Sequence, residues 1–201
     1  MSLLKRLLGK KKEESPYHLT LHLNARLMPL DRGMWYEDPI DALLAKAGIG
    51  EIDGGGTLMD ATREITSCDV DISLKKKSGA LYDQLLRVLE RFEMPKGSCL
   101  ISEEGSSEES RREIGNMEGL AFYLNGVELA EETYKTCDVD FVISELNRLL
   151  GNEGKYYSYW RGPTETALYV YGSSFEKMKG LIMPFREEYP LCEKSRIVQI
   201  A

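Results

Sequence analysis

The chain has 201 residues, 42% of them hydrophobic, and a formal net charge of −7 at pH 7. This length allows one large domain or two small ones, and no apolar run approaches the length that spans a bilayer, about 18 residues. The acidic charge argues against a nucleic-acid partner, because binding to phosphates requires clustered lysine and arginine. An acidic surface suits a basic protein partner instead.

The first residues predict an N-terminal basic amphipathic tail (1–15). Several lysines accompany a leucine stripe formed by Leu3, Leu4, Leu7 and Leu8. The segment lacks the apolar core and cleavage site of a signal peptide, so we expect a cytoplasmic protein. Two helical turns are too short to be stable alone, so a docked or frayed end is favoured over a membrane role.

Residues 16–102 are predicted to form a first βαββαβ unit. Apolar and polar side chains alternate from Tyr17 to Asn24, which predicts a half-buried strand. A helix is predicted to begin at Asp38, as N-cap before Pro39, and to end at Gly48. A glycine-bearing hairpin region, a one-sided strand (68–74), a helix (81–92) and a short strand (99–102) follow.

Residues 117–201 repeat this order after a predicted acidic linker, 103–116. Strands are predicted at 120–124, 156–160, 167–171 and 197–200, and helices at 142–150 and 175–189, where Pro184 is expected to kink or split the last helix. The predicted fold class is therefore α+β: a tandem duplication of a ferredoxin-like βαββαβ unit, with antiparallel sheets and helices on one face.

Function is expected on the sheet faces that the helices leave open. In the first unit this face carries His18 and His22 beside Asp69 and Asp71. Strand residues four apart lie about 13 Å from each other, at ~3.3 Å per residue, so both imidazoles cannot bind one ion. An exposed polar face is favoured over a metal site.

In the second unit the open face is aromatic, with Tyr123, Tyr169 and Tyr171 expected to point outward. Their position resembles the base-stacking platform of RNA-recognition domains, but the basic-aromatic sequence of such platforms is absent. Packing of the two sheets on each other, or on a partner protein, is favoured.

The main candidate for recognition is the connection Met28–Glu37, which is long for a loop between a strand and a helix. Aromatic residues flanked by carboxylates suit an interface with a basic protein, and the alternative is a loop that folds over the core with Trp35 buried. The candidate partner-binding residues here are Asp31, Arg32, Trp35, Tyr36, Glu37, Asp38 and Asp41.

Asp53 is a further candidate, because it opens an Asp-Gly-Gly-Gly-Thr sequence whose amides could cradle an anion. The lysine of a P-loop is missing, and a hairpin or bulge with glycines at positive φ is favoured. The four cysteines lie far apart without a CxxC pair, so we predict neither a metal nor a cofactor. No nucleophile–base pair can be assembled, which favours a protein that is not an enzyme.

Two stretches, Asp31-Arg32-Gly33 with Tyr36-Glu37-Asp38-Pro39 and the run from Gly50 to Thr57, resemble small bacterial proteins of unknown function. Immunity proteins of polymorphic or contact-dependent toxin systems are among them. The resemblance covers mostly the first half and implies a protein that binds and blocks a cognate toxin domain. The leading expectation is thus a non-enzymatic protein-binding module, an immunity protein. The alternative is a small-ligand-sensing regulatory protein that uses the cleft between two ferredoxin-like units.

Overall fold

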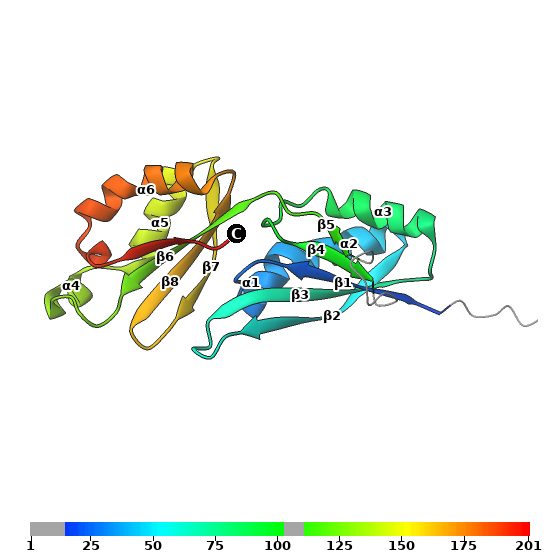
Figure 1. Ribbon diagram of the computed structural model, residues 1–201, viewed down its shortest axis with the longest axis horizontal. Coiled ribbons are helices and arrows are strands. Elements are labelled where there is room, and N and C mark those ends of the chain that lie inside the picture. The colour runs from blue at the N-terminus through cyan, green and yellow to red at the C-terminus, as the bar shows by residue number, and fades with distance from the viewer. Residues whose placement is uncertain (1–14, 103–110) are drawn as a thin grey trace, which may run out of the picture.

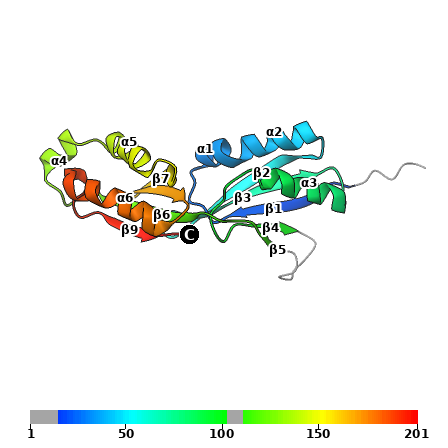
Figure 2. The same ribbon diagram turned by 90° about the horizontal axis from the view of Figure 1, so that it is seen from above.

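The computed structural model describes residues 15–102 and 111–201 as a mixed α+β fold with two antiparallel sheets. The predicted tail, apart from its last residue, and residues 103–110 of the predicted linker lie outside these ranges. The two sheets follow one another along the long axis of the molecule, and each has its helices on one side (Figures 1 and 2). We call the first sheet with its helices the N-terminal half and the second sheet with its helices the C-terminal half.

The N-terminal half has a five-stranded sheet in the order β2-β3-β1-β4-β5. Alternation along β1 directs its leucines toward the helices and places His18, Thr20 and His22 on the open face. The strands are β1 (Tyr17–Leu23), β2 (Gly50–Met59), β3 (Ile65–Leu74), β4 (Cys99–Ser102) and β5 (Arg111–Glu113), and the helices are α1 (Pro29–Arg32), the π-helical turn η2 (Gly33–Glu37), α2 (Asp38–Ala47) and α3 (Gly79–Leu89).

The C-terminal half has a four-stranded sheet in the equivalent order β7-β8-β6-β9, with its first and third strands central as predicted. Leu120, Phe122 and Leu124 pack under its helices, and α6 runs through Pro184 in one piece. The strands are β6 (Glu118–Asn125), β7 (Gly154–Arg161), β8 (Glu165–Gly172) and β9 (Arg196–Gln199), and the helices are α4 (Glu131–Thr136), α5 (Val139–Leu150), α6 (Phe175–Glu188) and the 3-10 turn η4 (Pro190–Cys192).

Two segments differ from the expectation. Residues 111–113, predicted as linker, form β5 on the edge of the first sheet. Residues 29–37, predicted as a loop, are helical and lead directly into α2, so Asp38 is not an N-cap. A proline inside a helix lacks the amide proton and crowds the carbonyl four residues before it. The wider π-helical turn ahead of Pro39, in which the amide of Asp38 donates to the carbonyl of Gly33, accommodates that disruption.

The glycine run of β2 lies at a β-bulge, as one of the two alternatives predicted, but without positive φ. Gly55 is instead a glycine because Glu37 and the backbone of Asp69 lie too close to it for a side chain. A Cβ at this position would lie 2.6 Å from Oε1 of Glu37 and 2.8 Å from the carbonyl oxygen of Asp69. Glycine therefore lets the helical segment 29–37 pack directly on β2.

No helix within residues 15–102 and 111–201 combines the length and the apolar character needed to cross a bilayer.

Candidate functional site

The segment Met28–Glu37 joins the two halves, and we call it the bridging segment. On one side Arg32 donates to the carbonyl oxygen of Gly56 in β2 (2.8 Å). On the other side Nε1 of Trp35 donates to the carbonyl oxygen of Tyr157 in β7 (3.0 Å), and the two rings stack with centroids 4.3 Å apart. One helical turn thus holds an edge strand of each sheet.

The predicted partner-binding residues of this segment form hydrogen bonds and ion pairs within the molecule. Tyr36 is only 2% exposed, its hydroxyl donates to the carbonyl oxygen of Glu93, and burial raises its pKa. Asp31 accepts a hydrogen bond of 2.6 Å from the hydroxyl of Ser158, across the two halves. Glu37 pairs with the largely buried Arg32 (2.7 Å).

Three further candidates lie outside the bridging segment. Asp41 accepts from the amide of Ile52 (2.8 Å), and Asp53 is exposed and lies 3.3 Å from His18. Asp38 is exposed at the start of α2. The aromatic candidates do not join them on the surface, because the tyrosines are buried and Trp35 is half-buried.

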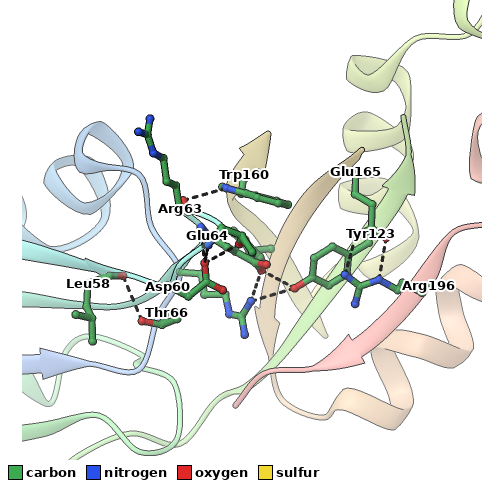
Figure 3. A network of polar contacts seen from close by, with 12 residues as sticks. Leu58, Asp60, Arg63, Glu64, Thr66, Tyr123, Trp160, Glu165 and Arg196 are labelled. Carbon is green, nitrogen blue, oxygen red and sulfur yellow. Dashed lines mark hydrogen bonds and ion pairs between the residues drawn. The ribbon is translucent and has the colours of Figure 1, made fainter. Parts of the chain in front are cut away.

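A second contact between the halves is the tyrosine cluster, formed by Arg26, Glu64, Tyr123 and Tyr169. Glu64, at the tip of the β2–β3 hairpin, accepts hydrogen bonds at Oε1 from the hydroxyls of Tyr123 (2.5 Å) and Tyr169 (2.9 Å) and pairs with Arg26 (Figure 3). Burial, reinforced by the bond to Glu64, raises the pKa of Tyr123 to about 12, and burial likewise raises the pKa of Tyr169. Both hydroxyls therefore remain protonated donors near neutral pH.

Neighbouring side chains extend this contact over the open face of the C-terminal sheet. Nε1 of Trp160 donates to the carbonyl oxygen of Arg63 (3.0 Å), and the guanidinium of Arg196 lies 3.5 Å from the ring centroid of Tyr123 (Figure 3). The hydroxyl of Tyr171 accepts from the amide of Arg26 (2.7 Å). Tyr123, Tyr169 and Tyr171 are thus covered by Arg26 and by Glu64 at the hairpin tip. The tyrosine face packs within the molecule against these residues and not, as one of the predicted alternatives had it, against the face of the other sheet.

A cavity of about 290 Å³, the inter-half pocket, lies where the two halves meet. The rings of Tyr157 and Tyr171 form part of its wall and meet edge to face, with centroids 5.4 Å apart. Its lining residues are Glu93, Asn116 and Met117 from one side and Gly151, Asn152, Glu153, Gly154, Lys155, Tyr157, Tyr171, Gly172 and Ser173 from the other.

The charged side chains that line the inter-half pocket differ in whether they already have a partner. Glu153 accepts from the hydroxyl of Ser173 (2.6 Å) and lies 3.6 Å from Lys177, and these groups lower its pKa. Over the described ranges, the side chains of Glu93 and Lys155 have no ion-pair partner. The pocket therefore presents one uncompensated carboxylate and one uncompensated ammonium group.

Two exposed amide side chains, Asn116 and Asn152, also line the inter-half pocket without a hydrogen-bond partner in residues 15–102 and 111–201. Each amide can donate and accept hydrogen bonds. Together with the two free charges, they give the cavity the capacity to orient a small polar molecule.

A metal centre is not assembled in the part of the chain that the structure describes, where no group of three or more histidine, cysteine or carboxylate side chains converges. His22 instead pairs with Asp69 alone (2.8 Å) on the open face of the first sheet. The cysteines are unpaired, and Cys68, Cys99 and Cys192 are buried.

Comparisons with known proteins give no family. No family model matches the sequence, and no curated protein matches it. Six solved chains match by structure. One is a candidate monooxygenase from Lactobacillus acidophilus, with a TM-score of 0.28 and 11% identity over 94% of this chain and 95% of that chain. Another is a heme-binding protein from Thermus thermophilus, with a TM-score of 0.28 and 12% identity over 92% of this chain and 89% of that chain. TM-scores this low carry no argument about ligand or reaction.

The expected function, a protein-binding immunity protein, is wrong. The bridging segment and the tyrosines that motivated it hold the two halves together, so their aromatic side chains are not available to a toxin domain. The alternative expectation, a ligand in the cleft between the units, agrees with the position of the inter-half pocket.

Four residues of these contacts are not predicted from the sequence: Glu64, Arg26, Glu93 and Lys155. Glu64 stands in a turn between two predicted strands, where a carboxylate is ordinarily solvated. Its tyrosine partners lie 59 and 105 residues away in the chain, so no local pattern marks the contact.

Proposed function

We propose that the protein senses a small polar ligand, which binds in the inter-half pocket without being turned over. The observation that supports this proposal is a cavity between the halves lined by unpaired polar groups from both sides. Ligand sites occur preferentially at interfaces between domains. A ligand that touches Glu93 and Lys155 together bridges the halves, and it stabilises the arrangement in which both residues face it.

The wall of the pocket links ligand binding to the joint between the halves. Tyr157 lines the pocket and carries the stacked ring of Trp35, and Tyr171 lines it and accepts the amide of Arg26. A shift of either tyrosine on ligand binding is transmitted to the bridging segment or to the tyrosine cluster. This arrangement supports a regulatory role, in which ligand occupancy sets how firmly the halves are joined.

A thermal-shift screen of a metabolite panel tests the proposal. At a concentration 100 times its Kd, a ligand stabilises the fold by about 2.7 kcal/mol, which raises the Tm of a chain of this size by roughly 5 to 11 °C. Asn152→Trp, which places an indole at the pocket, should abolish the shift. Lys46→Trp on the exposed face of α2 is the matched control and should retain it. A folded protein that no compound stabilises, or a shift that survives Asn152→Trp, contradicts the proposal.

Fluorescence provides an independent measurement. The sequence has two tryptophans, and Trp160→Phe leaves Trp35, stacked on the pocket residue Tyr157, as the single emitter. Ligand binding should change its emission. Recovery of the compound unchanged after prolonged incubation supports binding over catalysis.

We further infer that the halves descend from one duplicated ferredoxin-like unit, with copies at residues 16–102 and 117–201. The equivalent strand orders support this inference, and so does a shared detail. In each half, the helix before the edge strand provides a side chain that accepts from an amide beside the bulge of that strand: Asp41 from Ile52 (2.8 Å) and Asn147 from Tyr156 (3.1 Å). An alignment of homologues in which the two halves match in another register contradicts the inference.

A further inference from the structure

We propose that the ligand of the inter-half pocket is a small zwitterion of the α-amino-acid class, with its ammonium group at Glu93 and its carboxylate at Lys155. This inference rests on the proposed function and specifies the chemistry of the same site.

The charge balance of the pocket carries the argument. Glu153 is already satisfied by Ser173 and Lys177, which leaves Glu93 and Lys155 as the charges available to a ligand. Moving an unpaired charge out of water is costly, so a ligand that covers both residues must compensate both. A dicarboxylate would place a negative group against Glu93, and a diamine would place a positive group against Lys155. A molecule with one charge of each sign satisfies both residues.

The neighbours of each charge suit the assigned end of the ligand. Glu93 lines the pocket together with the rings of Tyr157 and Tyr171. An ammonium group held by Glu93 therefore lies beside aromatic rings, which attract cations. The amides of Asn116 and Asn152 supply additional donors for a carboxylate and acceptors for an ammonium group.

The size of the pocket limits the ligand. Its volume of about 290 Å³ lies at the lower end of small-molecule sites, which range from roughly 300 to 1,000 Å³ for drug-sized ligands. The cavity therefore suits a molecule of amino-acid size better than a larger cofactor.

Titration calorimetry on the full chain tests the inference. The probes are the twenty standard L-amino acids, succinate and putrescine, followed by the N-acetyl and carboxamide derivatives of the amino acid that binds best. We expect an amino acid to bind, and each derivative, which lacks one charge, to bind about tenfold more weakly.

Two variants assign the charges. Lys155→Gln should bind the amino acid and its carboxamide equally, and Glu93→Gln should bind the amino acid and its N-acetyl derivative equally. Lys46→Gln and Glu187→Gln replace exposed charges away from the pocket and should keep the discrimination of the wild type.

The possible failures are distinguishable. If succinate or putrescine binds in a manner sensitive to Asn152→Trp and no amino acid does, the zwitterion inference is overturned while the pocket remains a ligand site. The inference is equally overturned if an amino acid binds but both charge variants keep full discrimination. If no probe and no member of the wider metabolite panel binds, the proposed function fails as well.

Discussion

Replacing Glu64 with alanine removes the acceptor that Arg26, Tyr123 and Tyr169 share across the two halves. The change leaves the guanidinium group of Arg26 without its counterion and two tyrosine hydroxyl groups without their acceptor at a largely buried site, although Arg26 keeps its hydrogen bond to the hydroxyl of Tyr123 (3.0 Å). We expect this to be among the most destabilising single substitutions at the joint, because an abandoned buried charge costs more than the pair contributes.

The magnitude follows from the burial of the pair. The side chain of Glu64 is 11% exposed and that of Arg26 is 22% exposed. Removing one partner of a buried pair costs about 3 to 5 kcal/mol, and the remaining contact with water places the expected loss at the lower end, about 3 kcal/mol. For a chain of this length each kcal/mol shifts the Tm by about 2 to 4 °C, so Glu64→Ala should melt roughly 6 to 12 °C below the wild type.

Thermal denaturation followed by circular dichroism, with guanidinium unfolding as a second method, measures the effect. Glu64→Gln keeps an oxygen that accepts from the tyrosines and should lose less. The control is Glu131→Ala, which breaks the exposed pair with Lys135 on α4, where Glu131 is 84% exposed, and should cost at most about 0.5 kcal/mol. If Glu64→Ala melts no lower than Glu131→Ala, the tyrosine cluster does not contribute to the joint as argued.

Gly55→Ala should lower the free energy of unfolding by about 1 to 3 kcal/mol, because the added Cβ would contact Glu37 and the backbone of Asp69. Gly56→Ala is the control and should be close to neutral, because its Cβ would contact nothing within 4 Å. Urea denaturation measures both. The pKa values of Tyr123 and Tyr157 are raised from 10.0 to about 12, so their contribution to stability is complete below pH 10 and is lost as the pH rises toward 12. Stability measured against pH should fall in that window, together with the appearance of tyrosinate absorbance, and a flat profile would disprove the assignment. Cys137, the one half-buried cysteine, should react first with a thiol reagent in the native protein, and Cys137→Ser should remove this phase.

Local sequence patterns predict the secondary structure correctly where a single local feature determines it. Alternation from Tyr17 located β1, and Gly48, which adopts a left-handed conformation, ends α2 as expected. The helical conformation of the bridging segment cannot be predicted from the sequence, because Gly33 and Pro39 ordinarily interrupt a helix and no simple signal marks the π-helical turn that accommodates the proline.

The candidate site is harder to predict from the sequence than the fold, because it depends on contacts between distant segments. The period of two along β8 correctly separated Tyr169 and Tyr171 from Leu168 and Val170. It could not show what covers the tyrosines, since Arg26 and Glu64 come from the other half. The same holds for the inter-half pocket, whose lining residues are individually ordinary surface positions.

The hydrogen bonds from the helices to β2 and β7 bear on how the protein behaves at high concentration. Both strands lie at sheet edges, and the free backbone groups of an edge strand invite pairing with another chain, the first step of many aggregation processes. The side chains of Asp41 and Asn147 each accept a hydrogen bond from a backbone amide of one edge strand. The side chains of Arg32 and Trp35 each donate a hydrogen bond to a backbone carbonyl of one edge strand. The bridging segment that joins the halves thus also covers part of both edge strands, together with α2 and α5, and hinders their pairing with a strand from a second molecule.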